Sequence, residues 1–189
     1  MFKIYDIYTG VHESGQAKGL PCAVIVFADD KDKKGKEMSF NQVVLEIKKI
    51  GLKEVCLVGQ VTKHEGVREL AIGLAKTSHH VIILTSSSDS IETLRMVRNV
   101  SFYINIYPDD GADVNLKTFP LMKETDCLIM PTPNFTAYNK YVALLNSRLM
   151  SKPELIFELD PTEKDYEELK ESIIEDSKKR HAKTRVYSK

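Results

Sequence analysis

The most constraining stretch of the sequence is a short apolar run that lies between two amphipathic segments. The run at residues 55–58 ends at Gly59, and apolar residues recur at helical spacing on either side of it. An apolar run flanked by helices is typical of a parallel strand that is buried on both faces. Ligand sites in such folds lie at the carboxyl ends of the strands, so Gly59 and Gln60 are candidate site residues.

Length and composition exclude several classes of protein. The chain has 189 residues, which is enough for one domain with a sizeable core. Its 27 basic and 27 acidic side chains balance, so we expect no general attraction to nucleic acid or to anionic membranes. The sequence contains no apolar signal core and no run as long as a membrane span. We therefore expect a soluble, cytoplasmic protein.

The three cysteines point to a reducing compartment. Cys22, Cys56 and Cys127 each lie inside an apolar run, where a small buried hydrophobe belongs. An odd number of cysteines without paired spacing argues against a disulfide framework.

Strand-like and helix-like patterns alternate along most of the chain. Strands are expected at residues 2–8, 22–28, 55–58, 81–84, 101–107, 126–130 and 153–159, and helices at 39–50, from 64 onward, from 89 or 90, and at 136–150 and 162–179. This alternation predicts a parallel sheet with helices packed against it. Roughly six strands are too few for a complete barrel of eight units. We predict an α/β fold of the partial (β/α)6 open TIM-barrel type, with a doubly wound flavodoxin-like sheet as the alternative.

Several element ends carry specific signals. Ser39 and Gln42 match a capping box, and Gly51 ends the same helix. Asp89 or Ser90 is expected to cap a later helix. The last helix is expected to begin at Thr162 and to turn four apolar residues inward: Tyr166, Leu169, Ile173 and Ile174. We expect residues 1–179 to form a single domain and residues 180–189 to form a basic, frayed C-terminal tail.

Residues 7–59 contain a first strand, a loop with Gly15 and Gly19 before Pro21, the apolar strand 22–28, a helix and the strand that ends at Gly59. This order resembles the front half of the radical S-adenosylmethionine enzymes, and most closely the 7-carboxy-7-deazaguanine synthases. That family has a first strand, a glycine-rich loop of the type Q-G-E-G-x-x-x-G-x-P, an apolar strand, a three-cysteine loop, a helix and a strand ending in G-G-E-P. Gly15, Gly19 and Pro21 match the glycine-rich loop, and residues 58–61 stand at the G-G-E-P position. Thr85-Ser86-Ser87 stands where the family has a polar strand end. The resemblance covers about two thirds of the chain and implies a radical-SAM-like fold.

The departures from the family imply that radical chemistry is lost. The family holds an iron–sulfur cluster with a C-x3-C-x2-C loop, but residues 29–38 contain no cysteine. The cysteines present lie in three different expected strands, so they cannot form one cluster loop. The glutamate of G-G-E-P is absent, and Ser14 stands where the glycine-rich loop has its glutamate. We expect no iron–sulfur cluster, no metal site, no catalytic residue and no residual binding of S-adenosylmethionine.

Four other patterns have a functional and a structural interpretation. Asp29, Asp30 and Asp32 could bind a hard cation, but the lysines between them favour a charged turn. Two His-Glu pairs, at residues 12–13 and 64–65, could supply a metal or acid–base pair if both lie at the carboxyl rim of the sheet, but isolated His-Glu pairs are common on protein surfaces, which favours the structural interpretation. The pair of histidines at residues 79–80 precedes a strand and is interpreted as structural. Residues 85–88 could bind an anion ahead of a helix, although the same residues are ordinary caps.

These observations predict a non-catalytic, radical-SAM-like protein that acts as a binding or partner subunit. Its vestigial pocket, at the carboxyl ends of the strands, would be lined by Gly59, Gln60, Thr85, Ser86, Asn105 and Asn134. The expected partner is a second copy of the chain or another protein, and a small anionic molecule is a candidate ligand. The alternative is a cluster-free enzyme that acts on a small anionic or nucleoside-like substrate in the same pocket.

Overall fold

The structure, a computed structural model, describes residues 1–28, 34–77, 79–107, 115, 117–148 and 153–188. The chain divides into two compact units. Unit 1 comprises Met1–Thr85 and Ser90–Tyr103, and unit 2 comprises Ser86–Asp89 and Ile104–Lys189. That residues 1–179 behave as one folding domain stays a prediction. No helix within the described ranges has both the length and the hydropathy to cross a membrane.

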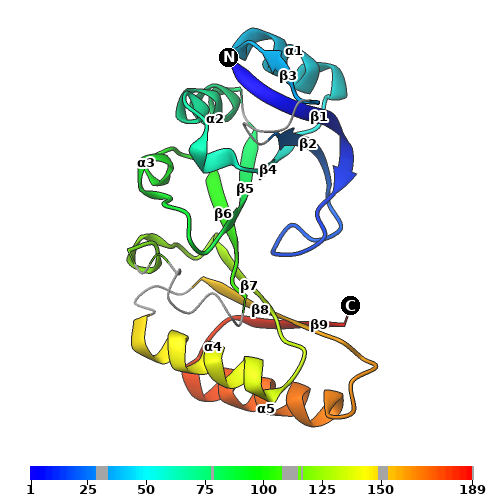
Figure 1. The fold of residues 1–189 in the computed structure, drawn as a ribbon, viewed down its shortest axis with the longest axis vertical. Coiled ribbons are helices and arrows are strands. Elements are labelled where there is room, and N and C mark those ends of the chain that lie inside the picture. Colours follow the sequence, from blue (N-terminus) through cyan, green and yellow to red (C-terminus); the bar gives the residue numbers. More distant parts are fainter. Residues whose placement is uncertain (29–33, 78, 108–114, 116, 149–152, 189) are drawn as a thin grey trace. The chain divides into compact units, whose positions relative to one another are not determined.

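Unit 1 is built around strands that follow one another in the order β3-β1-β2-β4-β5-β6 (Figure 1). The strands are β1 (Phe2–Val11), β2 (Pro21–Phe27), β3 (Lys36–Met38), β4 (Glu54–Gly59), β5 (His80–Ser86) and β6 (Val100–Asn105). β2, β4 and β5 run parallel, whereas β1 is antiparallel to both of its neighbours. The last residues of β5 and β6 belong to unit 2. The parallel strands predicted around the central run are confirmed, and β4 and β5 end at the same edge.

The helices of unit 1 bury the apolar stripes that the sequence contains. They are α1 (Phe40–Ile50), the 3-10 turn η1 (Val61–Lys63), α2 (Val67–Lys76) and the single turn α3 (Glu92–Arg95). α1 and α2 lie side by side, because a Cβ atom on Gly73 would come within 2.4 Å of the Phe40 ring. The core consists of alternate strand residues and inward helix residues, all fully buried: Ile25, Val43, Ile47, Val55, Leu57, Leu70, Leu74, Val81 and Ile83.

The capping box predicted at the start of α1 is present. The Ser39 hydroxyl accepts the Gln42 N–H at 3.4 Å, and the Gln42 side chain accepts the Ser39 N–H at 2.7 Å. Gly51 ends the helix in the left-handed conformation, with φ 75°. Both ends of α1 are therefore determined by residues next to the helix in sequence.

Replacing Ser39 with alanine should lower the free energy of unfolding by about 1 kcal/mol, because the Gln42 N–H loses its cap. Urea unfolding followed by circular dichroism measures the change. Asn41→Ala is the matched control, since Asn41 is an exposed residue inside the same helix. An equal loss in both variants would contradict a capping role for Ser39.

Two helix starts in unit 1 differ from the predictions. α2 begins at Val67 rather than near His64, because Gly66 takes the left-handed conformation with φ 81° and residues 61–63 form a separate 3-10 turn. α3 begins at Glu92 with Ile91 at its N-cap position, and Ile91 makes no side-chain cap. The Ser90 hydroxyl accepts the Glu92 N–H at 3.4 Å, as expected of a capping residue, whereas Asp89 does not cap the helix. Asp89 Oδ2 instead accepts the Ser86 N–H at 3.4 Å. Three apolar residues of this segment are buried, namely Ile91, Leu94 and Val97.

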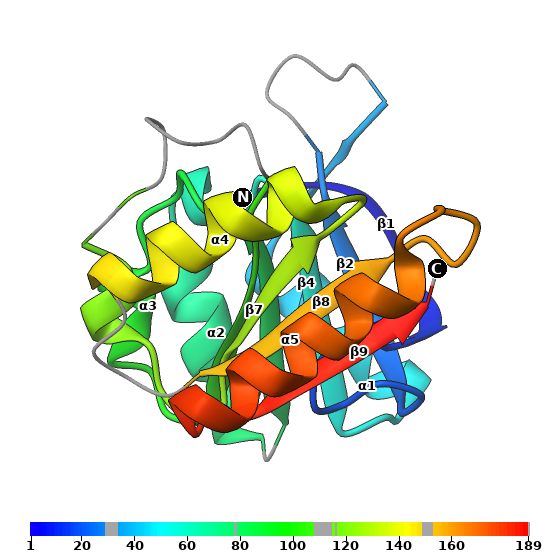
Figure 2. The ribbon, with the colours of Figure 1, turned by 90° about the horizontal axis from the view of Figure 1, so that it is seen from below.

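Unit 2 contains three parallel strands in the order β7-β8-β9. These are β7 (Cys127–Pro131), β8 (Glu154–Leu159) and β9 (Thr184–Ser188), with the 3-10 turn η2 (Phe119–Leu121) and the helices α4 (Phe135–Arg148) and α5 (Tyr166–Arg180). Figures 1 and 2 both show α4 and α5 side by side on one face of these strands. The helices and strands expected at 126–130, 136–150 and 153–159 are confirmed within one or two residues at the ends that the structure describes.

The frayed C-terminal tail is the clearest error of the sequence analysis. Residues 184–188 form β9, which pairs with β8 in a register that places Arg185 opposite Ile156 and Tyr187 opposite Glu158. The segment also contains Thr, Val and Tyr, which favour extended structure, but the sequence analysis was based on its basic residues. Tertiary pairing, not local composition, orders this end of the chain.

The last helix also starts later than predicted. Thr162 donates its N–H and its hydroxyl to Asp160 Oδ1, at 2.8 and 2.7 Å, so it belongs to a turn, and α5 begins at Tyr166. Of the expected inward residues, Leu169 and Ile173 are buried, but Ile174 is 40% exposed. The charged turn at Asp29–Asp32, the cation site that was its alternative, and residues 149–150 of the expected helix fall outside the described residues.

Candidate functional site

The predicted pocket residues divide between the two units. Gly59, Gln60 and Thr85 belong to unit 1, whereas Ser86, Asn105 and Asn134 belong to unit 2. In unit 1, Gly59 and Thr85 end neighbouring parallel strands and so lie at the same edge, followed by Gln60. Thr85 is buried, on the face of β5 that also carries Ile83. That these residues bind a ligand stays a prediction.

Gly59 has a structural reason to be glycine. Its φ is 93°, in the left-handed region, and it stands opposite Phe27 in the register of β2 and β4. A Cβ atom there would lie 2.4 Å from the Phe27 carbonyl oxygen. Backbone conformation and close approach therefore both require glycine, whatever binds at this edge.

The polar segment that follows β5 is occupied by its own hydrogen bonds. The Ser87 N–H donates to the Asn105 carbonyl at 2.9 Å, which brings the Ser86 and Asn105 segments together. The Ser88 N–H donates to the Ser86 hydroxyl at 3.3 Å, and the Ser86 N–H is taken by Asp89. An anion at residues 85–88 would have to displace these bonds and would face the Asp89 carboxylate.

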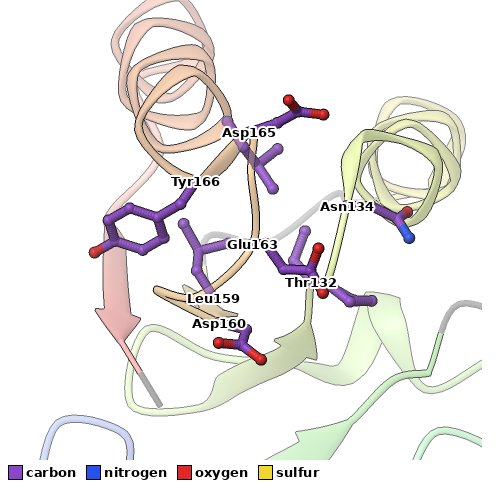
Figure 3. Close-up of a pocket in the computed structure, with 9 residues that line it drawn as sticks. Thr132, Asn134, Leu159, Asp160, Glu163, Asp165 and Tyr166 are labelled. Atoms are coloured by element: carbon purple, nitrogen blue, oxygen red, sulfur yellow. The ribbon is translucent and has the colours of Figure 1, made fainter.

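Asn134 lines a small pocket in unit 2 (Figure 3). The pocket lies where β7 and β8 end, at Thr132 and Asp160 respectively. The Asn134 side-chain oxygen accepts the Ala137 N–H at 3.0 Å, so this side chain caps α4. Asn134 therefore has a local structural role that sequence analysis missed, although the Asn-x-x-Ala spacing before a helix signals it.

The chemistry of this pocket differs from that of an anion site. Its volume is about 20 Å³, which is room for about one water molecule. Three carboxylates line it, those of Asp160, Glu163 and Asp165, and no basic residue does. Figure 3 shows the Asp165 carboxylate pointing away from those of Asp160 and Glu163. Among the described residues, no three His, Cys, Asp or Glu side chains converge in a way that could hold a metal ion.

Unit 1 contains a polar chain that the sequence did not reveal. His80 Nδ1 lies 2.8 Å from Glu54 Oε2, and His80 Nε2 lies 3.0 Å from Ser101 Oγ. The carboxylate can only accept, so Nδ1 carries the proton in the neutral ring and Nε2 accepts from the serine hydroxyl. The three residues stand at the amino-terminal starts of β4, β5 and β6. Sequence alternation gave no signal for them, because each is a single polar residue at a strand end.

The order of groups in this chain matches that of hydrolases with a nucleophilic serine. Ser101 is only 2% exposed, however, and a nucleophile must reach its substrate. The His80 side chain is 38% exposed and the Glu54 side chain 24%. His80 is therefore the group that could transfer a proton to or from a bound molecule, and Ser101 serves as its fixed hydrogen-bond partner.

His12 lies near the hydrogen-bonded residues Glu54, His80 and Ser101, and not at the carboxyl rim of the sheet. The backbone N–H of His12 donates to the Leu20 carbonyl at 3.0 Å, just before β2 begins. His64 Nε2, in contrast, lies 3.1 Å from the carbonyl oxygen of Ala28, just after β2 ends. The two His-Glu pairs therefore lie at opposite ends of β2, so the functional alternative of one shared metal or acid–base site is wrong. The error arises because β1 is antiparallel to β2, so residues that follow β1 lie beside strand starts.

Burial governs the ionisation of His12. The side chain is buried, and its Nε2 atom has no hydrogen-bond partner among the described residues. Burial lowers the pKa of His12 from 6.5, and the charge of Glu54 opposes part of that shift. His12 is therefore neutral in the folded protein at neutral pH.

The stability of the protein should fall as the pH drops below 6.5, where the unfolded chain protonates His12. The folded state binds fewer protons there, so this residue can contribute a slope of up to about 1.4 kcal/mol per pH unit. Urea unfolding of wild type and His12→Phe between about pH 8 and pH 5 isolates the contribution. The two profiles should run parallel at the upper end and diverge below 6.5; parallel profiles throughout would refute the assignment.

The comparisons with known proteins place the fold. No model of a known protein family matches the chain, and neither does any curated protein sequence. Among solved structures, the crystal structure of QueE from Escherichia coli matches with a TM-score of 0.70 and 14% sequence identity, over 100% of this chain and 94% of QueE. The chain has a QueE-like fold. QueE is 7-carboxy-7-deazaguanine synthase, a radical SAM enzyme, and at 14% identity the likeness to it concerns the fold alone.

The thiols of this chain do not fit the iron–sulfur cluster that a QueE-like fold implies. Cys22, Cys56 and Cys127 form no disulfide with one another and lie in β2, β4 and β7. Burial raises the pKa of the Cys22 thiol and, with Cys22 and Glu13 nearby, raises that of Cys56 to about 12. A cluster of this type needs three neighbouring thiolates, whereas these cysteines lie in three separate strands. They therefore do not form the ligand set of such a cluster.

Proposed function

We propose that this chain is a non-catalytic protein of the radical-SAM-like fold that acts as a binding or partner subunit. The fold rests on the likeness to QueE along the whole chain. One observation carries the loss of radical chemistry: the three cysteines lie inside three separate strands, and residues 29–38 contain none. Without three neighbouring thiolates there is no cluster to deliver an electron to S-adenosylmethionine.

We further propose that the strands form a partial (β/α)6 barrel rather than a doubly wound sheet. In unit 2 both long helices cover the same face of the strands. In unit 1 α1 and α2 are neighbours, as the contact between Gly73 and Phe40 requires. Within each unit neighbouring strands also follow chain order, β2-β4-β5-β6 in unit 1 and β7-β8-β9 in unit 2. A doubly wound sheet reverses its strand order at a switch point, so strands in unreversed order with helices on one face favour the barrel type.

The carboxyl-end pocket is proposed to be vestigial. The backbone groups of Ser86 and Ser88 and the side chain of Asn134 already form hydrogen bonds within the chain. The pocket at Asn134 has room for about one water molecule and is acidic. A partner, either a second copy of the chain or another protein, is then the more fitting ligand than a small anion.

The test combines reconstitution with a ligand screen. Anaerobic incubation with iron and sulfide should leave the protein colourless, because no cluster loop exists. Thermal-shift measurements with S-adenosylmethionine, nucleosides and sugar phosphates should then show no stabilisation. Stable visible absorbance of an iron–sulfur cluster, or strong stabilisation by S-adenosylmethionine, would refute the proposal.

A cluster-free enzyme for a small anionic or nucleoside-like substrate is the second candidate. The hydrogen-bonded residues Glu54, His80 and Ser101 support it, since an oriented and half-exposed histidine can act as a general base. They stand at the amino-terminal starts of their strands, so this enzyme would act there and not in the carboxyl-end pocket. Strong stabilisation by one nucleoside or sugar phosphate in the same screen would favour this candidate. His80→Gln should then abolish turnover of that compound while Ser101→Ala retains part of it, because only His80 is accessible.

A further inference from the structure

An amphipathic groove lies on the outer flank of unit 1. It has a volume of about 350 Å³, within the range of about 300–1,000 Å³ that is usual for ligand pockets. α2 forms one wall, and the segment after α3 forms the other. The lining residues are Arg68, Ile72, Ala75, Lys76, Met96, Val97, Arg98 and Asn99. None of the predicted pocket residues belongs to this groove.

The groove exists because the connection between β5 and β6 contains only one helical turn. α3 spans Glu92–Arg95, whereas a longer helix would pack along α2 and cover its flank. Arg68, Ile72 and Ala75 recur on α2 at helical spacing, so they form a second stripe beside the buried one. Met96 follows α3 and is 82% exposed. An unbranched, flexible side chain of this kind adapts to different partners.

The charges around the groove have one sign. Arg68, Lys76 and Arg98 line it, and none of the residues that line it is acidic. These three side chains make no ion pair or hydrogen bond with other described residues of the chain. The apolar floor between them is provided by Ile72, Ala75 and Val97. The net charge of the whole chain is zero, so the cationic character is local to this flank.

We propose that this groove binds an acidic, amphipathic peptide segment of a partner protein. Apolar side chains of the segment would fill the floor beside Met96, and its carboxylates would pair with Arg68, Lys76 and Arg98. Helix-in-groove recognition uses this combination of apolar anchors and complementary charge. The inference rests on the proposed partner role, for which it names the docking surface and the chemistry of the partner.

Two other occupants fit the groove less well. A flat anionic membrane would contact the basic rim but would leave a hollow of about 350 Å³ unfilled. Single-stranded nucleic acid stacks its bases on aromatic side chains, and none of the residues that line the groove is aromatic. A peptide segment can contact the apolar floor with its apolar side chains and pair with the basic rim through its carboxylates.

Fluorescence anisotropy of a labelled acidic peptide, with Leu and Phe at helical spacing, tests the proposal on the full chain. The triple variant Arg68→Glu/Lys76→Glu/Arg98→Glu should bind this peptide about tenfold more weakly or worse. The three positions are exposed, and circular dichroism confirms that the variant is folded. Lys48→Glu, an exposed charge reversal on α1, is the matched control and should leave binding unchanged. A peptide with Gln and Asn in place of its acidic residues should also bind about tenfold more weakly.

Met96→Ser supplies an independent readout of the apolar floor. It should weaken binding of the acidic peptide without changing the dependence of binding on salt, because it removes apolar contact and no charge. Absence of peptide binding, equal binding to the triple variant, or binding of phosphatidylserine vesicles in place of the peptide would overturn the proposal. Those results would not refute the partner role, because a partner could still bind through another surface. Strong stabilisation by a small molecule in the ligand screen would instead refute the partner role.

Discussion

Replacing Gly59 with alanine is expected to lower the free energy of unfolding by about 3 kcal/mol. Two costs add at this position. An L-residue is strained at a φ of 93°, and the new Cβ atom would lie 2.4 Å from the Phe27 carbonyl oxygen. The carbonyl belongs to the backbone of a central strand, so it cannot move aside without disturbing the pairing of β2 and β4. Urea unfolding monitored by circular dichroism measures the loss.

Gly19→Ala is the matched control for this prediction. Gly19 has a φ of 83°, but apart from its chain neighbours no atom of the described residues lies within 4 Å of the position that a Cβ would occupy. The control therefore keeps the conformational strain and lacks the clash, so its expected cost is only about 1 kcal/mol. Equal losses in the two variants would mean that the close approach of Phe27 to Gly59 does not contribute.

Arg185→Met is expected to destabilise the protein by about 3 kcal/mol, because it leaves a buried carboxylate without its nearest positive charge. Glu154 is fully buried at the start of β8. Its Oε1 atom lies 2.6 Å from Arg185 Nε on β9, an ion-pair contact rather than a well-aligned hydrogen bond, and 3.9 Å from Lys183 Nζ. The pair joins β9 to the rest of unit 2. Hydrogen exchange of the β9 amides should accelerate in the variant along with the loss measured by urea unfolding.

Two further variants separate the ion pair from simple loss of packing. Lys183→Met removes the more distant and more exposed cation, so it should cost less than about 1 kcal/mol. Glu154→Gln combined with Arg185→Met removes the uncompensated charge and should recover part of the stability that Arg185→Met loses. If the double variant were less stable than Arg185→Met alone, the buried charge would not be the cause.

Local features of the fold were predictable because short-range physics determines them. The capping box of Ser39 and Gln42 involves residues three positions apart, and Gly51 ends the helix that they begin. The strand that contains Cys56 follows from its apolar run and its flanking helices. The absence of a cluster loop follows from the positions of the cysteines alone. None of these features depends on residues far away in the sequence.

Signals at the ends of elements were less dependable. Thr162 and Asp89 both carry side chains that can cap a helix, yet each takes part in a turn instead. Such residues offer the backbone an alternative to helical hydrogen bonds, and the choice depends on where the neighbouring elements pack. The same ambiguity applies to Asn134, which was predicted to bind a ligand and is found capping α4.

The sequence by itself determined the class of fold, the order of helices and strands along its central part and the absence of neighbouring thiolates, because these depend on periodicity and on which residues are present. The tertiary structure decided the rest. Strand register brought Glu54, His80 and Ser101 into one hydrogen-bonded chain, and pairing with β8 turned a basic segment into β9. The brevity of α3 exposed the groove beside Met96. Contacts of this kind form between segments distant in the chain, whose register and packing no local pattern encodes.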